Sequence, residues 1–174
     1  MRALYLTLVL CLVACPKNDT TAPPADVAGN YSLQTVHAQP LPFDFPVDSF
    51  LFAPDTIVVI TRWTDNTVIL QTTGRIEEHL GGTATHWSSS VPTHVVDNWT
   101  DFYTGRWTAT SNSVLIVFDS LAVDGGTPAV LGAPIRLTFG VNGDGTLAGH
   151  YSYRHSSLGP APASVDYPLV YRKQ

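Results

Sequence analysis

The sequence predicts an all-β fold: a single antiparallel up-and-down barrel of about eight or nine strands, preceded by a leader and a tether. Two observations from Gly29 onward predict it. No apolar stripe is sustained at the spacing of a helix. Instead, runs of about eight to ten residues alternate with turn residues, and several of these runs alternate apolar with polar side chains. This pattern is typical of strands that bury one face.

The chain opens on a segment that fits an export signal. Arg2 is the one early positive charge, and Ala3–Ala14 carries no charge. A bilayer span needs about 20 apolar residues, so this run is too short to cross a membrane and has the length of a signal h-region. We expect residues 1–14 to be a signal peptide. The chain would therefore be exported.

Both cysteines lie at this end of the chain, at Cys11 and Cys15. If residues 1–14 are removed, the folded domain contains no disulfide, although export would permit one. The alternative is that both are ordinary residues of a cytosolic N-terminus, where two cysteines could also be a metal pair.

The segment Leu12-Val13-Ala14-Cys15 resembles the lipobox of bacterial lipoproteins. The resemblance implies cleavage before Cys15, palmitate-type acylation of Cys15, and permanent anchoring to a lipid bilayer. Pro16 follows where an aspartate would signal inner-membrane retention, which favours the outer membrane of a two-membrane cell envelope. Residues 15–28 are polar and contain prolines, so we expect a lipidated flexible tether before a domain at 29–174.

Turn residues divide the rest of the chain into strands. Predicted turns lie at Asp65-Asn66, Gly81-Gly82, Ser111-Asn112, Asp124-Gly125-Gly126 and Asn142–Gly145.

The alternating runs predict which face of each strand is buried. Arg106 and Arg136 fall on the polar side of their strands, opposite Trp107 and Leu137. The barrel interior is therefore expected to be apolar and aromatic, without an obvious buried charge.

Two connections and the last strand depart from this pattern. Gln39–Pro54 holds four prolines and four phenylalanines, and we expect it to lie across one barrel mouth as a lid or plug. Ser156–Ser164 is expected to be a plain loop. Pro168 lacks a backbone donor, so the last strand, Val165–Arg172, is expected at an edge or with a bulge.

Short motifs at both ends and in the middle of the domain resemble small lipocalin-like (calycin-type) barrels of bacterial lipoproteins. They are Gly29-Asn30-Tyr31-Ser32-Leu33, Gln39-Pro40-Leu41-Pro42, Gly105-Arg106-Trp107-Thr108 and Leu169-Val170-Tyr171-Arg172. The resemblance implies a barrel that binds a small molecule. Tyr31 stands where a lipocalin has tryptophan, and no helical segment follows the last strand.

Composition and spacing argue against several functions. Acidic residues outnumber basic ones, 14 to 9, and no basic face is evident, which excludes nucleic acid as a partner. No two of the six histidines share a strand face at i and i+2, so neither a metal site nor another cofactor is expected.

The sequence also predicts no enzyme. Ser88–Ser90, His94 and Asp97 contain the residue types of a nucleophilic triad, but no elbow motif positions them. Glu77 and Glu78 are adjacent, so on a strand they point apart. Catalysis would require a polar constellation that only the fold could bring together.

Aromatic residues are the remaining candidates. Tyr103, Trp107, Tyr151 and Tyr153 are predicted to face inward and line a cup for a small apolar ligand, with core filling as the alternative. Trp87 and Trp99 flank a predicted polar loop and are the predicted surface contacts, and outer loops such as Ser88–Thr100 are expected to touch a partner. The sequence therefore leaves two functions open. One is a ligand-binding module, and the other is a solid interaction module that touches an envelope protein.

Overall fold

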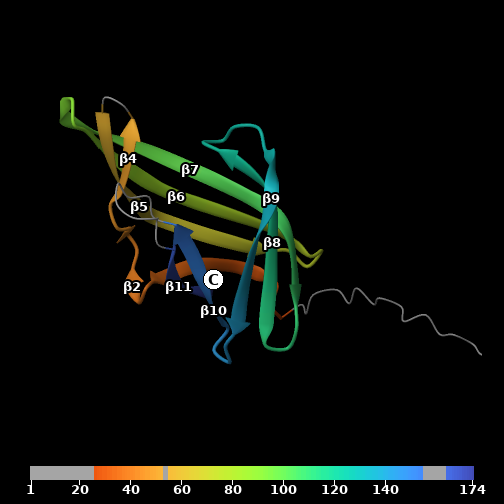
Figure 1. Ribbon diagram of the computed structural model, residues 1–174. Coiled ribbons are helices and arrows are strands. Elements are labelled where there is room, and N and C mark those ends of the chain that lie inside the picture. The colour runs from red at the N-terminus through yellow and green to blue at the C-terminus, as the bar shows by residue number, and fades with distance from the viewer. Residues whose placement is uncertain (1–25, 53–54, 155–163) are drawn as a thin grey trace, which may run out of the picture.

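The computed structural model describes residues 26–52, 55–154 and 164–174 (Figure 1). Across these ranges the chain forms strands and turns and no helix, so the domain is all-β, as predicted. None of these residues forms a helix long and apolar enough to span a membrane. The predicted signal peptide, Cys15, residues 16–25 of the tether, and residues 156–163 of the predicted loop lie outside the described ranges.

Eight strands form a closed antiparallel barrel in the order β1-β11-β10-β9-β8-β7-β6-β5, with β5 pairing back to β1. Three short strands, β2 to β4, lie between β1 and β5 in the sequence. The strands are β1 (Gly29–Val36), β2 (Gln39–Pro40), β3 (Phe43–Asp44), β4 (Asp48–Phe52), β5 (Asp55–Leu70), β6 (Arg75–Ser88), β7 (Val91–Ala109), β8 (Ser113–Val123), β9 (Ala129–Val141), β10 (Thr146–Arg154) and β11 (Ser164–Lys173).

Tight turns gather at one end of the barrel, which we call the closed end. They connect β5 to β6 at 71–74, β7 to β8 at 110–112, and β9 to β10 at 142–145. Gly74 and Gly145 adopt φ values of 79° and 80°, a left-handed conformation that glycine adopts without steric cost. Asp144 Oδ1 accepts hydrogen bonds from the backbone N–H and the hydroxyl of Thr146, which stabilises the last of these turns.

The N-terminal segment of the domain is fastened at the closed end. Val27 and Ala28 are buried, although the sequence places them in the tether, so the folded domain includes both. The Tyr31 hydroxyl donates to the Val27 carbonyl (2.7 Å), and Lys173 Nζ donates to the Asp26 carbonyl (2.7 Å).

Two pairs of strands separate toward the opposite end, which we call the open end. Strand β1 pairs with β5 only between Gly29–Ser32 and Thr67–Leu70. Strand β9 pairs with β10 only between Phe139–Val141 and Leu147–Gly149. Beyond these contacts each strand keeps its other neighbour, so the wall is continuous at the closed end and parts toward the open end.

The segment after β1 fills one of these separations and does not form the predicted lid. Strands β3 and β4 pair along β5 and extend the wall. Phe45 is buried, with its ring 4.8 Å from that of Trp63 and 4.9 Å from that of Tyr167. Phe45 therefore fastens this segment to the wall, with the ring of Phe43 packed against it.

Strands β5, β6 and β7, with β4 paired along β5, run well beyond the barrel as an extension, seen at the upper left of Figure 1. The predicted turns at Asp65-Asn66 and Gly81-Gly82 are therefore wrong, because both lie inside continuous strands. At Asp65-Asn66 the chain continues as a strand that carries a β-bulge between Trp63 and Asp65. The two glycines instead allow close approach, as described below for Gly82.

Two further predictions about strands are corrected. Ser88–Thr100 is not a loop, because β7 starts at Val91 and pairs with β6 across a tight turn. Strand β11 is not an edge, because it pairs with both β1 and β10, and Pro168 lies opposite His150. The bulge lies in its neighbour β1, between Leu33 and Thr35.

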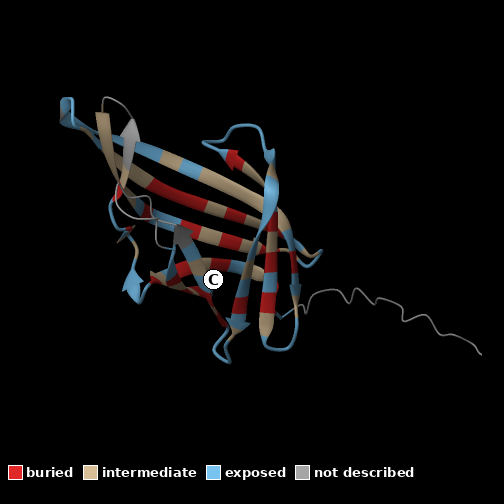
Figure 2. Ribbon diagram, viewed as in Figure 1, coloured by how far each residue is buried: buried red, intermediate tan, exposed pale blue. Residues whose placement is uncertain are grey.

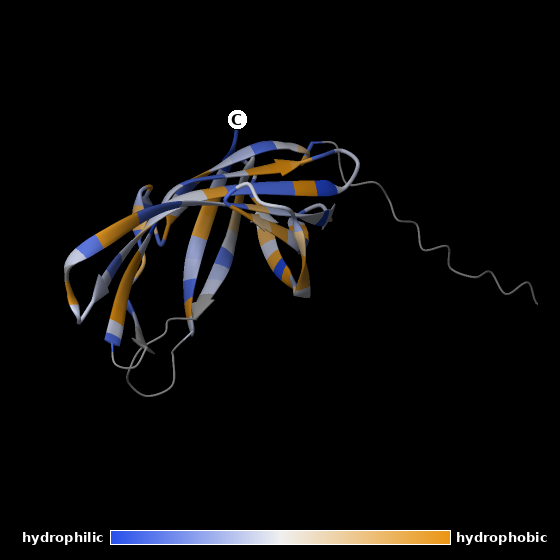
Figure 3. Cartoon of the chain, turned by 90° about the horizontal axis from the view of Figure 1, so that it is seen from above, coloured by the Kyte–Doolittle hydropathy of each residue, from blue (hydrophilic) through white to orange (hydrophobic). Residues whose placement is uncertain are grey.

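The hydrophobic core fills the closed half and continues toward the open end through Trp63, Phe45 and Tyr167. Buried residues lie along the barrel, whereas the extension of β5–β7 and most of β9 are half-buried or exposed (Figure 2). Apolar and polar residues alternate along the strands (Figure 3). The largest fully buried side chains are Trp107, Phe118, Phe139, Leu70, Ile76, Ile116, Leu147, Leu169, Val36 and Val114.

Candidate functional site

An aromatic hollow of about 400 Å³ lies at the open end, and we call it the mouth hollow. Its side chains come from five barrel strands, because the inward face of each strand repeats every second residue. They are Thr61, Trp63, Leu80, Trp99, Asp101, Tyr103, Val123 and Tyr151.

Gly82 makes room for one wall of this hollow. A Cβ at Gly82 would lie 2.5 Å from Cζ2 of Trp99 and would also collide with the Arg62 carbonyl oxygen. The indole of Trp99 therefore packs closely against Gly82 of β6. Trp63 also lines the hollow, and its ring centroid lies 5.2 Å from that of Tyr151.

A smaller cavity of about 40 Å³ lies deeper in the barrel and shares Trp63, Leu80, Tyr103 and Tyr151 with the mouth hollow. We call it the inner cavity. Its volume suits a water molecule or a small chemical group, whereas ligand pockets usually have about 300–1,000 Å³. A ligand of ordinary size would therefore occupy the mouth hollow.

A carboxyl group lines the inner cavity, contrary to the expected apolar interior. Glu78 is buried, and its Oε1 accepts hydrogen bonds from Asn66 Nδ2 (2.6 Å) and the Tyr171 hydroxyl (3.4 Å). Burial raises the pKa of Glu78 to about 7, more than these two hydrogen bonds lower it. At neutral pH the carboxyl is thus divided between its charged and protonated forms.

Burial is also the main cause of the raised pKa of the titratable groups around Glu78. Burial, then the charges of Glu78 and Asp101, raises the pKa of Tyr151. Burial also raises the pKa of Tyr171 and Tyr103, so the phenols of the cavity stay protonated. The pKa of Asp101 is raised by partial burial and by the charge of Asp124.

The residues predicted to line a cup are divided between the two halves. Tyr103 and Tyr151 line both the mouth hollow and the inner cavity. Trp107 lies in the solid closed half, 2% exposed, with its Nε1–H donating to the Gln71 carbonyl (2.9 Å). Tyr153 lies in β10, and its side chain is outside the described part of the structure.

The two tryptophans predicted as surface contacts lie on opposite faces. Trp99 faces the mouth hollow and packs on the core. Trp87 is 37% exposed and lines an outer groove of about 430 Å³ with Ile60, His94 and Val96. The ring centroids of Trp87 and His94 are 6.1 Å apart.

The serine-rich turn is held by hydrogen bonds of its own. The Ser89 and Ser90 hydroxyls donate to Asp55. Asp97 lies 3.4 Å from His86, while His94 lies against Trp87, so the fold does not assemble the triad residues. Within the described ranges no group of three or more histidine, cysteine, aspartate or glutamate residues is placed to hold a metal ion.

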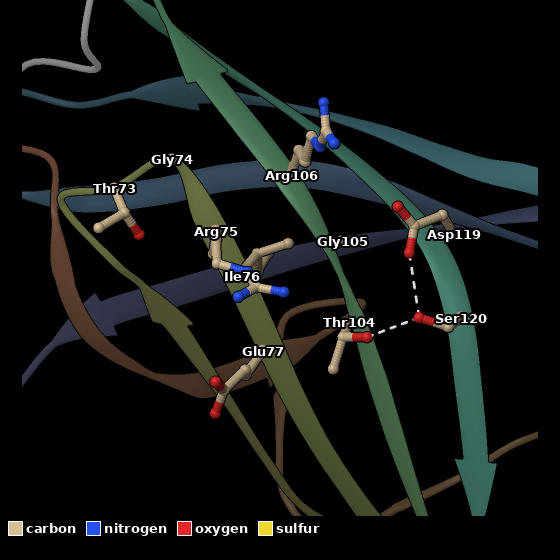
Figure 4. A pocket seen from close by; sticks show the side chains of 10 residues that line it. All are labelled: Thr73, Gly74, Arg75, Ile76, Glu77, Thr104, Gly105, Arg106, Asp119 and Ser120. Atoms are coloured by element: carbon tan, nitrogen blue, oxygen red, sulfur yellow. Dashed lines mark hydrogen bonds between the residues drawn. The ribbon is translucent and has the colours of Figure 1, made fainter. Parts of the chain in front are cut away.

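Another depression, of about 660 Å³, lies on the outer wall near the closed end (Figure 4). Arg75 and Arg106 lie opposite each other on β6 and β7, and the Arg106 guanidinium extends away from that of Arg75. Thr104, Ser120 and Asp119 form a hydrogen-bonded chain along its side. It has no aromatic lining and mixed charges, so it has less of the character of a ligand pocket than the mouth hollow.

Sequence reasoning missed Glu78 and Asn66. The alternation of Ile76, Glu78 and Leu80 could have shown that Glu78 shares the apolar face of β6. The inward orientation of Asn66 could be predicted only with knowledge of the β5 bulge, because the bulge shifts which residues of that strand face inward.

Comparison with known proteins identifies no relative of this chain. No family model, curated protein or solved structure matches this chain.

Proposed function

We propose that this protein is a non-catalytic binding module that holds a small, largely apolar ligand in the mouth hollow. The observation that carries the proposal is the enrichment of aromatic rings around a hollow of ligand size at the open end. Trp63, Trp99, Tyr103 and Tyr151 offer a large apolar contact area there, and their polar groups can fix a ligand's orientation.

The proposal includes a lipid anchor at Cys15 that holds the module at a bacterial cell envelope, the outer membrane more than the inner. The lipobox-like end of the leader supports it. The described chain starts at the closed end, where Asp26 contacts Lys173. The mouth hollow lies at the other end, so a tethered module would present it away from the bilayer.

A neutral fluorescent probe, N-phenyl-1-naphthylamine, tests the binding function. We expect saturable binding to the purified protein, and we expect Trp99→Ala to weaken it at least fivefold because the substitution removes one wall of the hollow. Trp87→Ala is the matched control, since it removes the same side chain from the outer groove. Equal effects of the two substitutions, or no saturable binding, would contradict the proposal.

Fatty-acid labelling tests the anchor. We expect incorporation of labelled palmitate into the wild type in bacterial cells, and loss of both label and membrane association in Cys15→Ala. Membrane association that survives this substitution would defeat the anchor.

A second function is favoured by the outer groove around Trp87. Its apolar residues Ile60, Val96 and Trp87 lie on the outward face of the β5–β7 extension, where Val96 is 53% exposed. Such a surface suits contact with an envelope protein. Cross-linking in cells would support this alternative if an envelope protein were captured by the wild type and lost in Trp87→Ala but retained in Trp99→Ala.

A further inference from the structure

The walls of the mouth hollow combine aromatic faces from three strands. Trp63 comes from β5, Trp99 and Tyr103 from β7, and Tyr151 from β10. Aromatic faces carry partial negative charge and attract a cation held within about 6 Å of the ring centroid. Several rings around one space form the kind of cage that binds an alkylated ammonium group.

Carboxyl groups lie at both ends of this aromatic wall. Asp101 lines the mouth hollow and Glu78 lines the inner cavity beneath it, where Tyr103 and Tyr151 are shared by both spaces. Neither space is lined by lysine, arginine or histidine. Across the described residues, neither carboxyl is paired with a basic side chain.

The polar groups around the inner cavity also leave an acceptor unused. Asn66 donates its amide to Glu78, and its Oδ1 is buried without a hydrogen-bond partner. A buried acceptor without a donor is costly, as is a buried carboxylate without a counter-charge. The base of the site therefore lacks positive charge, and one of its buried acceptors, Asn66 Oδ1, has no donor.

These features distinguish between classes of ligand. An anion such as a fatty acid would be repelled by Asp101 and Glu78 and would find no basic side chain. A neutral apolar ligand would leave both carboxyls without a counter-charge. A cation on an apolar body would contact the rings and lie near both carboxyls.

Resting on the proposed binding function, we propose that the mouth hollow takes an organic cation: an alkylated ammonium group carried on an apolar body. The ammonium group lies among Trp63, Tyr103 and Tyr151, on the side of the hollow that adjoins the inner cavity. Trp99 covers the apolar body, and Asp101 faces the charge.

Three probes of similar shape and different charge test the ligand class. They are phenyltrimethylammonium (cation), 2-phenyl-2-propanol (neutral) and 2-methyl-2-phenylpropanoate (anion), measured by quenching of tryptophan fluorescence in the full-length purified protein. We expect the cation to bind at least tenfold more tightly than the alcohol, and the anion more weakly still. Equal binding of cation and alcohol, tighter binding of the anion, or no binding of the cation would overturn the cation proposal.

A charge variant with a matched control gives a second test. Asp101→Asn should weaken binding of phenyltrimethylammonium at least fivefold more than it weakens binding of the alcohol. Asp119→Asn removes an exposed carboxylate of the outer wall and should change neither. Equal loss of cation affinity in the two variants would overturn the role of Asp101. Continued saturable binding of N-phenyl-1-naphthylamine would show that the general binding function survives either failure.

Discussion

The closed and open halves of one barrel use the same kinds of residues differently. In the closed half, Trp107, Ile116 and Phe139 are at most 2% exposed and the strands pair without interruption. In the open half, Val95 and Val130 are 54% and 86% exposed, and β1 and β9 each leave a neighbour. The packing is therefore tightest at the closed end, whereas Trp99, Tyr103 and Tyr151 at the open end are only partly buried and can contact a ligand.

The largest expected difference in the free energy of unfolding is between alanine variants of two tryptophans of the same strand. Trp107→Ala should lower the free energy of unfolding by about 3–5 kcal/mol, because it empties a fully buried site. Trp99→Ala should lower it by less than about 1.5 kcal/mol, because Trp99 is only partly buried. Urea unfolding followed by far-ultraviolet circular dichroism measures both. Similar losses would abolish the distinction between the two halves.

A smaller effect is expected from the buried carboxyl. The pKa of Glu78 is raised from 4.5 to about 7 in the folded state, so the folded protein binds this proton more tightly than the unfolded chain. The stability that this group contributes is complete below pH 4.5 and is lost as the pH rises through 7. Glu78→Gln should therefore raise the free energy of unfolding at pH 8 by about 3 kcal/mol, relative to wild type.

The control for this prediction lies one residue away. Glu77 points outward and accepts a hydrogen bond from Gln71. Glu77→Gln should therefore change the free energy of unfolding by less than about 0.5 kcal/mol, both at pH 8 and below pH 4.5. The other titratable groups that face Glu78 are Tyr103 and Asp101 on β7, Tyr151 on β10 and Tyr171 on β11. Both variants retain them, so they cancel in the comparison. A Glu78→Gln variant with the wild-type pH dependence would show that Glu78 is not the responsible group.

The smallest of the three effects concerns the wall of the mouth hollow. Gly82→Ala places a methyl group against Trp99 and the Arg62 carbonyl, and should cost about 1–3 kcal/mol as the wall shifts. Gly143→Ala is the control at the closed end, where a Cβ meets nothing within 4 Å, and it should cost less than about 0.5 kcal/mol. Probe affinity measured alongside stability should fall for Gly82→Ala alone. If Gly82→Ala were as mild as Gly143→Ala, the close packing of Trp99 would be wrong.

Much of the closed half could be predicted from the sequence, because its determinants are local. Asn142–Gly145 and Ser111-Asn112 form turns where turn residues predict them. Gly81-Gly82 misled because the same residue type also permits close approach of distant groups, here Trp99, and no local pattern distinguishes the two uses. For the same reason the sequence predicts a loop at Ser88–Thr100, where the structure has the start of β7. It also predicts one surface for Trp99 and Trp87, which lie on opposite faces.

The candidate site depended on longer-range information. Tyr103 and Tyr151 could be predicted to face inward from strand alternation alone. Their meeting with Trp63, Asp101 and Glu78 depends on the register of β5, β6 and β7 and on the bulge in β5, which pair residues far apart in the sequence. The sequence therefore predicted an aromatic interior and missed its carboxyl groups.

Mapping a small apolar ligand onto the folded protein tests whether the binding site lies at the open end. The measurement is backbone amide chemical-shift perturbation by nuclear magnetic resonance, during titration with 2-phenyl-2-propanol. We expect saturable shifts confined to the open end, centred on Trp63, Trp99, Tyr103 and Tyr151. Shifts centred on the closed-end turns or on the outer groove around Trp87, or no saturable shifts at all, would contradict it.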